Sequence, residues 1–566
     1  MSTKGLIKES DVSIIKHRII ESVSTALILL VFSTPVLAQR WEQIRKVVAS
    51  DRADYDYFGK SVAISGNLAI IGACEEDEDI DGLNTIVNSG SAYIFRCDST
   101  SWTQQAKIVA LDRTAYKEFG ISVDISGDFA VVGASHDSFN VDGTDTLAWA
   151  GSAYIFHYDG VSWSQQQKLV ASDRGAGDLF GFRVSISGNY AVVGAYKEDH
   201  DIAYTDSMYD AGSVYIFHYD GTTWNQQQKI VASDRDVEDW FGCSIDISGD
   251  YVVVGAYQED HNTSGLDSLI SAGAVYVFHN DGVSWREQQK LVASDRNGGD
   301  FFGSSLAISG DYLITGAPLE DEDVDGANTQ LTSGSAYIFV RNNSTWTQQQ
   351  KIVASDRERN DLFGFSVDIT DYYAIVSATM ECHDVNGVNP MSWAGSAYIF
   401  KREGTAWAQQ QKIVASDRAG GEHFGNSVSV SGDNIIIGTE RNSTDASGSN
   451  VKFIAGAAYI FHYSDASGLP FASDVEYTPV EFGLHRSFPN PFNPSVTLSY
   501  GLTHGGQTTL KVYNMRGQLV ETLKDGFQAA GNYSLSWQPR NLSTGVYIVR
   551  LESGNKTNLQ KIVFVK

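Results

Sequence analysis

The sequence predicts an all-β protein: a seven-bladed β-propeller closed by an N-terminal strand and followed by a small C-terminal β-sandwich. Three observations support this class. Asp-Arg pairs recur every 61 residues, each copy holds four short strand-like segments, and the repeat stops well before the C-terminus. The pairs begin at Asp51, Asp112, Asp173, Asp234, Asp295, Asp356 and Asp417. Seven copies without an insertion are typical of a repeat architecture.

Residues 1–38 are predicted to be an export signal. Lys4, Lys8, Lys16 and Arg18 precede the apolar stretch ALILLVF at 26–32, and small residues end the segment at Ala38. A short membrane anchor is the alternative, but this apolar stretch is too short to cross a bilayer. No later stretch approaches that length, so we expect a mature chain without a transmembrane segment.

Each copy within residues 39–463 is predicted to form one blade of four antiparallel strands. One copy contains FGFRVSIS, NYAVVGA, GSVYIFHYD and WNQQQKIVA, in which apolar residues alternate with the period of a strand. Ser-Gly-Asp or Ser-Gly-Asn makes a tight turn between the first two strands. Radial closure of seven such sheets protects strand edges that an open stack would expose.

A fragment of the repeat at the start of the mature chain predicts how the ring closes. Tryptophan opens the fourth strand, but the seventh copy has Gly468 at that place and no strand after it. The series is Trp41, Trp102, Trp163, Trp224, Trp285, Trp346 and Trp407. We therefore expect residues 41–50 to pair as the outer strand of the seventh blade.

The pattern FG, SVxISGDxAVVGA and GSAYIF resembles the FG-GAP repeat, the propeller blade also found in integrin alpha chains. The resemblance covers residues 41–463 and implies the propeller fold, while it implies little about function. Integrin-type blades often carry a calcium loop between the first two strands. This chain has only a short turn there, so calcium is not carried over to that position.

The long connection between the second and third strands of each copy is the first candidate for a site, because long loops on a rigid scaffold often carry binding groups. Two of these loops match D-x-D-x-D-G. Alternate carboxylates before a glycine direct several oxygens at one Ca²⁺ ion. The candidate ligands are Asp77, Asp79 and Asp81 in the first copy and Asp321, Asp323 and Asp325 in the fifth, with Thr85 and Thr329 as additional oxygens.

A solvated acidic turn, whose Asp and Asn side chains bond their own backbone, is the alternative for these loops. The other copies keep the register but lose acids, as in SFNVDG at 138 and STDASG at 443. No Glu matches the usual twelfth ligand, so a calcium site would be weak, on the order of 10⁻⁴ to 10⁻³ M.

Aromatic residues that only some copies carry are the second candidate. Trp149 and Trp393 share one loop position in the second and sixth copies, and Tyr204 and Tyr209 belong to the third. Exposed aromatic rings would stack on a sugar or anchor a protein partner. Packing inside the loop is the alternative.

Groups that recur in every copy are better explained as scaffold. We expect the Asp-Arg pairs to form inter-blade ion pairs or turn caps, and the Gln-Gln-Gln-Lys segments to protect an outer edge strand. Histidines beside acids in the loops allow occasional metal ligation. No H-E-x-x-H, G-x-S-x-G or P-loop motif occurs, so nothing nominates a nucleophile or an acid/base pair.

Beyond residue 463 the repeat ends. Residues 464–481 are predicted to be a linker and residues 482–566 a β-sandwich, with strands such as TTLKVYNMRGQLVETL and GVYIVRLESG. With SFPNPFNPSVTLSY in front, this tail is similar to the type A C-terminal sorting domain of the type IX secretion system. The resemblance implies passage across an outer membrane, often with removal of the tail. An immunoglobulin-like accessory domain is the alternative.

Charge separates the two parts of the chain. Residues 39–463 hold 28 Lys and Arg against 59 Asp and Glu, whereas residues 482–566 hold 9 against 3. The acidic ring lacks the cationic surface that nucleic acids require. It suits cations or a basic partner.

These features predict a secreted or cell-surface propeller, expected as a monomer, that serves as a non-enzymatic adhesion module. Its long-loop face would bind a protein or glycan partner, assisted by Ca²⁺ at the Asp loops, and its tail would engage the type IX secretion machinery. The alternatives are a secreted enzyme that acts on polysaccharide over the propeller axis and a structural envelope protein. A broad rim of unshared aromatics would favour binding.

Overall fold

The computed structural model describes residues 40–98, 101–203, 205–265, 267–464, 483–484, 496–502, 506–528, 531–539, 542–554 and 556–565. The predicted signal peptide, residues 1–38, lies outside these ranges, as does the predicted linker apart from Ser464, which ends a strand. Within them, no helix has the length and apolar character that a membrane crossing requires.

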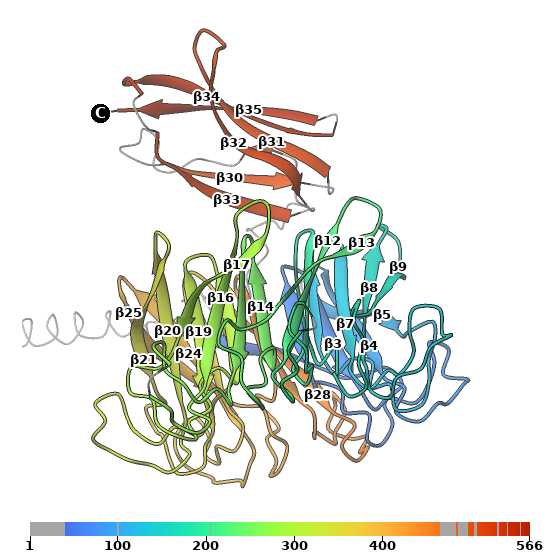
Figure 1. The fold of residues 1–566 in the computed structure, drawn as a ribbon. Helices are drawn as coiled ribbons and strands as arrows, with labels where there is room; N and C mark the ends of the chain where they lie inside the picture. The colour runs from blue at the N-terminus through green and yellow to red at the C-terminus, as the bar shows by residue number, and fades with distance from the viewer. Residues whose placement is uncertain are drawn as a thin grey trace, which may run out of the picture. The chain divides into compact units, whose positions relative to one another are not determined.

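The repeats form seven antiparallel sheets of four strands, called blades 1 to 7 in the order of their inner strands (Figure 1). The inner strands are β2 Val62–Ser65, β6 Val123–Ser126, β10 Arg183–Ser187, β14 Ser244–Ser248, β18 Ser305–Ser309, β22 Phe363–Ile369 and β26 Val428–Ser431. The second strands are β3 Leu68–Ala73, β7 Phe129–Ala134, β11 Tyr190–Ala195, β15 Tyr251–Ala256, β19 Tyr312–Ala317, β23 Tyr373–Ala378 and β27 Asn434–Thr439. The third strands are β4 Ser91–Asp98, β8 Ser152–Tyr158, β12 Ser213–Tyr219, β16 Ala274–Asn280, β20 Ser335–Asn342, β24 Ser396–Glu403 and β28 Ala457–Ser464. The outer strands are β5 Ser101–Ile108, β9 Trp163–Leu169, β13 Trp224–Ile230, β17 Trp285–Leu291, β21 Thr345–Ile352, β25 Ala406–Ile413 and β1 Arg40–Val47.

The seventh sheet confirms the predicted closure. Its order is β1-β28-β27-β26, so the N-terminal strand is the outer strand of the last blade. The Lys46 ammonium lies 2.7 Å from the Asp417 carboxylate and 3.0 Å from the Asn442 amide oxygen, both in blade 7. The two ends of the repeat region therefore complete one sheet.

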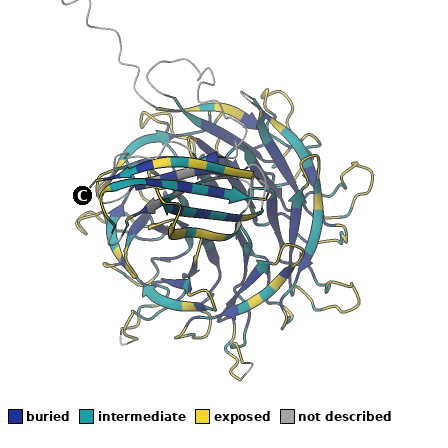
Figure 2. Cartoon of the chain, turned by 90° about the horizontal axis from the view of Figure 1, so that it is seen from above, coloured by how far each residue is buried: buried dark blue, intermediate teal, exposed yellow. Residues whose placement is uncertain are grey.

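The hydrophobic core of the ring lies between neighbouring blades. Phe58 is fully buried, packs 5.4 Å from the Tyr93 ring, and shares a cluster with Ile460 of blade 7. Gly59 follows with φ of 93°, and a Cβ there would lie 2.4 Å from the Ala457 carbonyl oxygen. The Phe-Gly pair thus marks the place where adjacent blades touch, and Figure 2 shows the resulting ring of sheets end-on.

The inner strands have a free edge whose N–H groups are satisfied by side chains of neighbouring strands. Asp246 of blade 4 accepts a hydrogen bond from Ile308 N of blade 5 at 2.8 Å and one from Ile247 N of its own strand at 2.8 Å. Asp124 and Asp368 do the same in blades 2 and 6. Each of these aspartates therefore serves two blades.

Residues 483–565 contain a small β-sandwich, as predicted. Its sheets have the orders β29-β30-β33 and β32-β31-β34-β35. Leu498 and Tyr500 of the first sheet share one core with Val512, Val549 and Ile562 of the second. The strands are β29 Gly483–Leu484, β30 Val496–Leu502, β31 Gly506–Asn514, β32 Leu519–Gln528, β33 Gly531–Trp537, β34 Gly545–Ser553 and β35 Lys556–Phe564.

Candidate functional site

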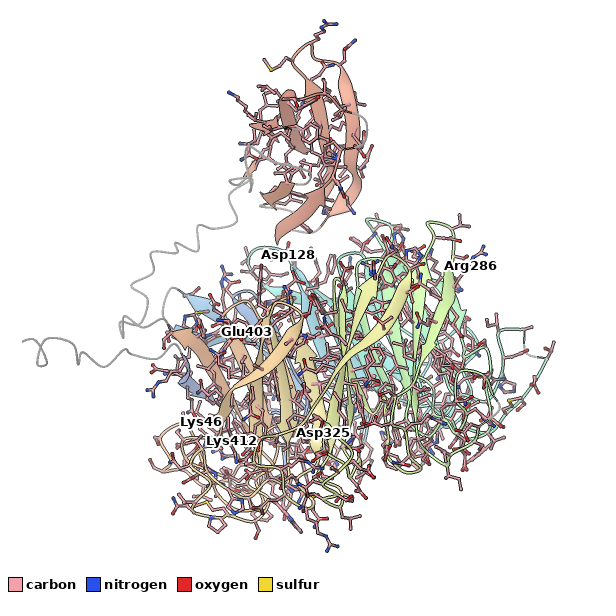
Figure 3. All side chains as sticks on the ribbon, turned by 90° about the vertical axis from the view of Figure 1, so that its left-hand side faces the viewer. Lys46, Asp128, Arg286, Asp325, Glu403 and Lys412 are labelled. Atoms are coloured by element: carbon pink, nitrogen blue, oxygen red, sulfur yellow. The ribbon has the colours of Figure 1, made fainter. Side chains whose placement is uncertain are left out.

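The seven long loops and the links between blades share one side of the ring, here called the loop face. In blade 1 the long loop follows β3 and precedes β4, and its backbone is bonded to the next link: Tyr116 N donates to Val87 O at 2.8 Å. Figure 3 shows Asp325 among these loops and Arg286 toward the other side of the ring. The loop face gathers both groups of candidates that the sequence nominates.

The D-x-D-x-D-G loop of blade 1 forms a small hairpin that uses its own carboxylates. Asp79 accepts hydrogen bonds from the N–H groups of Asp81 at 3.1 Å and Leu83 at 2.9 Å. Donation from Leu83 N and from the Asn84 side-chain amide, with a smaller part from Asp81 N, lowers the pKa of Asp79 to about 2. Asp77 accepts from Asn88 N at 2.7 Å. This is the self-capped turn that the sequence left open as the alternative.

The loop of blade 5 repeats this geometry. Asp323 accepts from Asp325 N and from Ala327 N, both at 3.0 Å, and backbone donation lowers its pKa. Asp321 accepts from Thr332 N at 2.6 Å. Asp81, Asp325, Thr85 and Thr329 are exposed. The six predicted ligands thus divide into four that bind backbone N–H groups and two exposed at the loop tips.

An arginine from the following link already supplies a positive charge to each of these loops. Arg357 donates to the carbonyl oxygens of Asn328 and Asp321, both at 2.7 Å. Arg113 donates to the carbonyl oxygens of Asn84 and Asp77 in the same way. In the described part of the chain, no three His, Cys, Asp or Glu side chains are grouped so that they could hold a metal ion. Calcium binding stays a prediction.

The predicted aromatic candidates stand out on the loop face. Trp149 is 57% exposed and Trp393 is 53% exposed, and both have left-handed φ, 55° and 57°. A bulky residue rarely adopts this conformation, and blade 1 has Asn88 at the equivalent place, with φ of 50°. Tyr209 is 59% exposed, while Tyr204 lies outside the described residues.

An apolar side chain is exposed on the loop face of every blade, at one of two adjacent positions of the repeat. We call this set the apolar rim. It consists of Val87, Trp149, Tyr209, Ile270, Leu331, Trp393 and Phe453. Sequence reasoning found only the aromatic members in blades 2, 3 and 6, because one exposed aliphatic residue is ordinary. The sequence signal that could have revealed the whole set is an apolar residue at one or the other of these two adjacent positions in every repeat.

Polar clusters buried inside the blades account for the recurring Asp and Lys. In blade 1, Lys107 lies 2.7 Å from Asp51 and 3.2 Å from Glu76, and the Tyr93 hydroxyl donates to these acids. Lys46 has this place in blade 7. The lysines are therefore buried ion-pair partners, and the expectation that they guard an outer edge is wrong.

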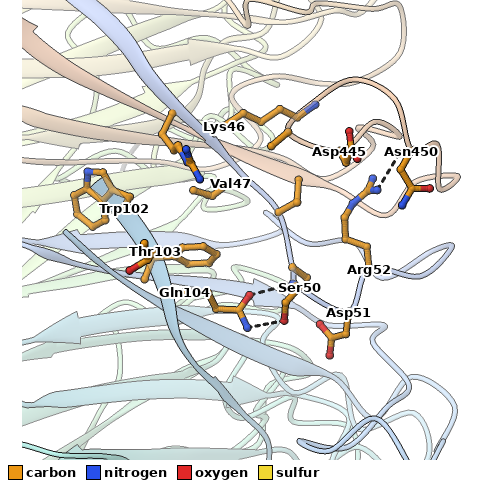
Figure 4. A pocket seen from close by; sticks show the side chains of 15 residues that line it. Lys46, Val47, Ser50, Asp51, Arg52, Trp102, Thr103, Gln104, Asp445 and Asn450 are labelled. Carbon is orange, nitrogen blue, oxygen red and sulfur yellow. Dashed lines mark hydrogen bonds between the residues drawn. The ribbon is translucent and has the colours of Figure 1, made fainter. Parts of the chain in front are cut away.

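A cavity of about 620 Å³ lies at the seam between blades 7 and 1 (Figure 4). It is bordered by β1 and the start of β5, where Gln104 Nε2 donates to Ser50 Oγ at 3.0 Å. Arg52 donates to the Asn450 carbonyl oxygen at 3.1 Å. These hydrogen bonds connect blades 7 and 1, so the cavity lies where the ring is closed.

Comparison with known families agrees with the geometry. The FG-GAP repeat model matches residues 41–95, 102–156, 163–217, 224–278, 285–339, 346–400 and 407–461. The model of the secretion system C-terminal sorting domain matches residues 486–566. No curated protein matches the sequence. Each matched repeat starts one strand before its blade, which is the offset that closes the ring.

Proposed function

Since this chain belongs to the FG-GAP repeat family, we propose that it is a non-enzymatic binding module that holds a protein or glycan partner on its loop face. The C-terminal sorting domain directs the protein through the type IX secretion machinery to the cell surface or the medium. Residues 1–38 serve as the signal that starts this export. Adhesion outside the cell is the role that follows.

The apolar rim is the observation that carries the proposal. Seven blades each expose one apolar side chain on the same face, so a partner that lies across several blades would cover several of these side chains at once. Trp149 and Trp393 are the strongest anchors, because tryptophan is enriched where binding energy is concentrated. The left-handed φ recurs at this place in all seven blades, but the fold does not require tryptophan there, since blade 1 holds Asn88.

The double variant Trp149→Asn, Trp393→Asn tests the proposal. It places at both positions the residue type found in blade 1, so the fold and the melting temperature should be kept. Binding to the ligands detected on a glycan and surface-protein array should fall by roughly tenfold or more, as expected for two anchor residues.

The matched control is Val161→Asn, Val283→Asn. Both valines are strongly exposed, and both lie in the short turns opposite the loop face. If the control lowers array binding as much as the tryptophan variant does, the loop face is not the binding surface.

A further inference from the structure

A ring of serines stands at the start of the inner strands, and blade 3 breaks it. Ser61 Oγ accepts a hydrogen bond from Val123 N at 3.1 Å, and Ser244 Oγ donates to Gly303 O at 2.6 Å, so these hydroxyls join neighbouring blades. The set is Ser61, Ser122, Ser244, Ser305, Ser366 and Ser427, with Arg183 in blade 3. Because arginine has no acceptor atom, Arg183 cannot replace the serine as an acceptor from the next blade.

The guanidinium of Arg183 has no ionic partner among the described residues. Its Nη1 donates to the carbonyl oxygen of Phe182 at 3.1 Å, and its Cζ lies 4.4 Å from the Phe182 ring centre. The groups that face it are the phenols of Tyr196 and Tyr257 and the thiol of Cys243, and burial lowers its pKa. A cation held there without a counter-ion costs free energy, and an anion from solution would offset that cost.

Five aromatic rings form a continuous row beside Arg183. Phe182 lies 4.6 Å from Tyr196, Tyr196 lies 5.4 Å from Trp240, Trp240 lies 5.3 Å from Tyr257, and Tyr257 lies 4.9 Å from Phe301, measured between ring centres. All five are partly exposed, so solvent reaches the row. We call Arg183 and these rings the axial cluster, because they stand where inner strands of blades 3, 4 and 5 begin.

The chemistry of the axial cluster selects its ligand. A guanidinium presents a planar fork that matches a carboxylate with two hydrogen bonds. Aromatic faces add flat apolar surface at low entropic cost. The backbone donors next to Arg183 are already used, because Val184 N donates to Ser122 Oγ and Phe182 N donates to Leu179 O. A peptide terminus, which is usually captured by free backbone N–H groups, therefore fits less well than a ring that carries a carboxylate.

We propose that the axial cluster is a binding site for a uronic acid residue, whose carboxylate pairs with Arg183 while its ring lies on the aromatic row. The site is distinct from the apolar rim and adds acidic sugar recognition to the partner binding of the loop face. Its place near the axis suits the end of an oligosaccharide.

The variant Arg183→Ser tests this site in the full-length protein. Serine is the residue that the other six blades hold there, so the variant should fold and melt at a higher temperature, because an unpaired and partly buried charge is removed. Titration with glucuronate, followed by calorimetry, should show affinity lowered by roughly tenfold or more, as for loss of a charged hydrogen-bond pair. Arg183→Lys, which keeps the charge without the fork, should bind with intermediate affinity.

Two control ligands and two control variants accompany this experiment. Glucose lacks the carboxylate and acetate lacks the ring, so both should bind the unaltered protein more weakly than glucuronate. Arg286→Ser makes the same substitution at an exposed arginine on the other side of the ring and should change neither melting nor binding. The tryptophan variant of the apolar rim should bind glucuronate normally, which separates this site from the proposed function.

The proposal is overturned if Arg183→Ser binds glucuronate as well as the unaltered protein, or if acetate binds as tightly as glucuronate. It is also overturned if Arg183→Ser melts at a lower temperature, since the arginine would then be part of the scaffold. Binding of a peptide with a free C-terminal carboxylate in preference to glucuronate would replace the sugar by a peptide ligand.

Discussion

Single side chains such as Asp246 accept the hydrogen bonds of the inner-strand N–H groups that the sheets leave unpaired. Seven inner strands each present an N–H group at the same edge position. Asp124, Asp246 and Asp368 accept two each, and Ser429 accepts the remaining one from Ile64 N at 3.3 Å. Because the N–H groups are all accepted by these side chains, blades 1 and 5 can hold alanine at the place where blades 2, 4 and 6 hold aspartate. A buried backbone donor without an acceptor is rare, and here none of the seven is left over.

We predict that Asp246→Ala destabilises the ring about twice as much as Ser429→Ala. The first variant removes the acceptor of two N–H groups and the second removes the acceptor of one. With about 1–3 kcal/mol for each unsatisfied donor, Asp246→Ala should lower the free energy of unfolding by about 2–6 kcal/mol. Urea denaturation measures both. If the two variants lose the same free energy of unfolding, the second hydrogen bond to Asp246 does not contribute to stability.

The D-x-D-x-D-G loops show the limit of residue patterns. The same letters suit a calcium loop and a turn that binds its own backbone, because both need carboxylates at alternate positions and a glycine with positive φ. Gly82 and Gly326 have φ of 68° and 67°. The position of Arg113, which approaches from the next link, was not visible in the local pattern.

The prediction of calcium binding is tested by calorimetric titration. We expect a weak site, on the order of 10⁻⁴ to 10⁻³ M, because Ca²⁺ must compete with the backbone donors and the arginine of each loop. Melting temperature should rise at millimolar Ca²⁺, and the variant Asp79→Asn, Asp323→Asn should abolish the rise. Absence of heat and of a melting shift in the unaltered protein removes the claim.

At the scale of the blade, each sheet contains a buried polar cluster whose charge differs from copy to copy. Blade 3 buries Asp178 beside Glu198 and Asp173, and burial, together with these acids, raises the pKa of Asp178 to about 7. Blade 2 has Lys117 at the equivalent place, 2.9 Å from Asp112. Burial opposes ionisation of Asp112, but the ammonium groups lower its pKa to about 2. The blades therefore respond differently to pH.

We predict that the ring loses stability as pH rises from about 4 to about 7. A carboxyl whose folded pKa lies above its unfolded value holds a proton that favours folding at low pH, and this contribution disappears as pH passes the folded pKa. Asp178→Asn keeps an acceptor for Gly175 N and cannot ionise. At pH 8 it should raise the free energy of unfolding by about 4 kcal/mol, or the melting temperature by about 4 °C, and at pH 5 by only about 1.5 kcal/mol.

Asp281→Asn is the matched control for this experiment. It also removes one negative charge, but Asp281 is a turn residue whose pKa is lowered by backbone donors. Its melting curve should follow the unaltered protein between pH 5 and 8. If both variants flatten the pH profile equally, the effect comes from net charge and not from the buried cluster.

At the scale of the whole ring, stability depends on β1, a strand from the start of the repeat region that completes the last blade. Lys46 and Asp417 are 371 residues apart in sequence and 2.7 Å apart in space. Deleting residues 40–50 should expose the third strand of blade 7, leave the Asp417 cluster without its lysine, and broaden and lower the thermal transition.

A circular permutant that carries residues 40–50 after residue 464 provides the control. It restores the same strand to the same blade by a different connection, so a sharp melt near that of the original ring is expected. A deletion variant that unfolds as sharply and at the same temperature as the full chain would refute the closure by β1.

Sequence alone determined the features that repeat: the number of blades, the four strands in each and the strand that closes the ring. These features follow from local periodicity and from the 61-residue spacing, and both can be seen in a single sequence. Tertiary structure decided which polar groups face each other. The lysines are buried, the acidic loops bind their own backbone and an arginine from the next link, and Arg183 faces rings from two blades. Such contacts arise only when segments far apart in the chain approach, so no local pattern contains them.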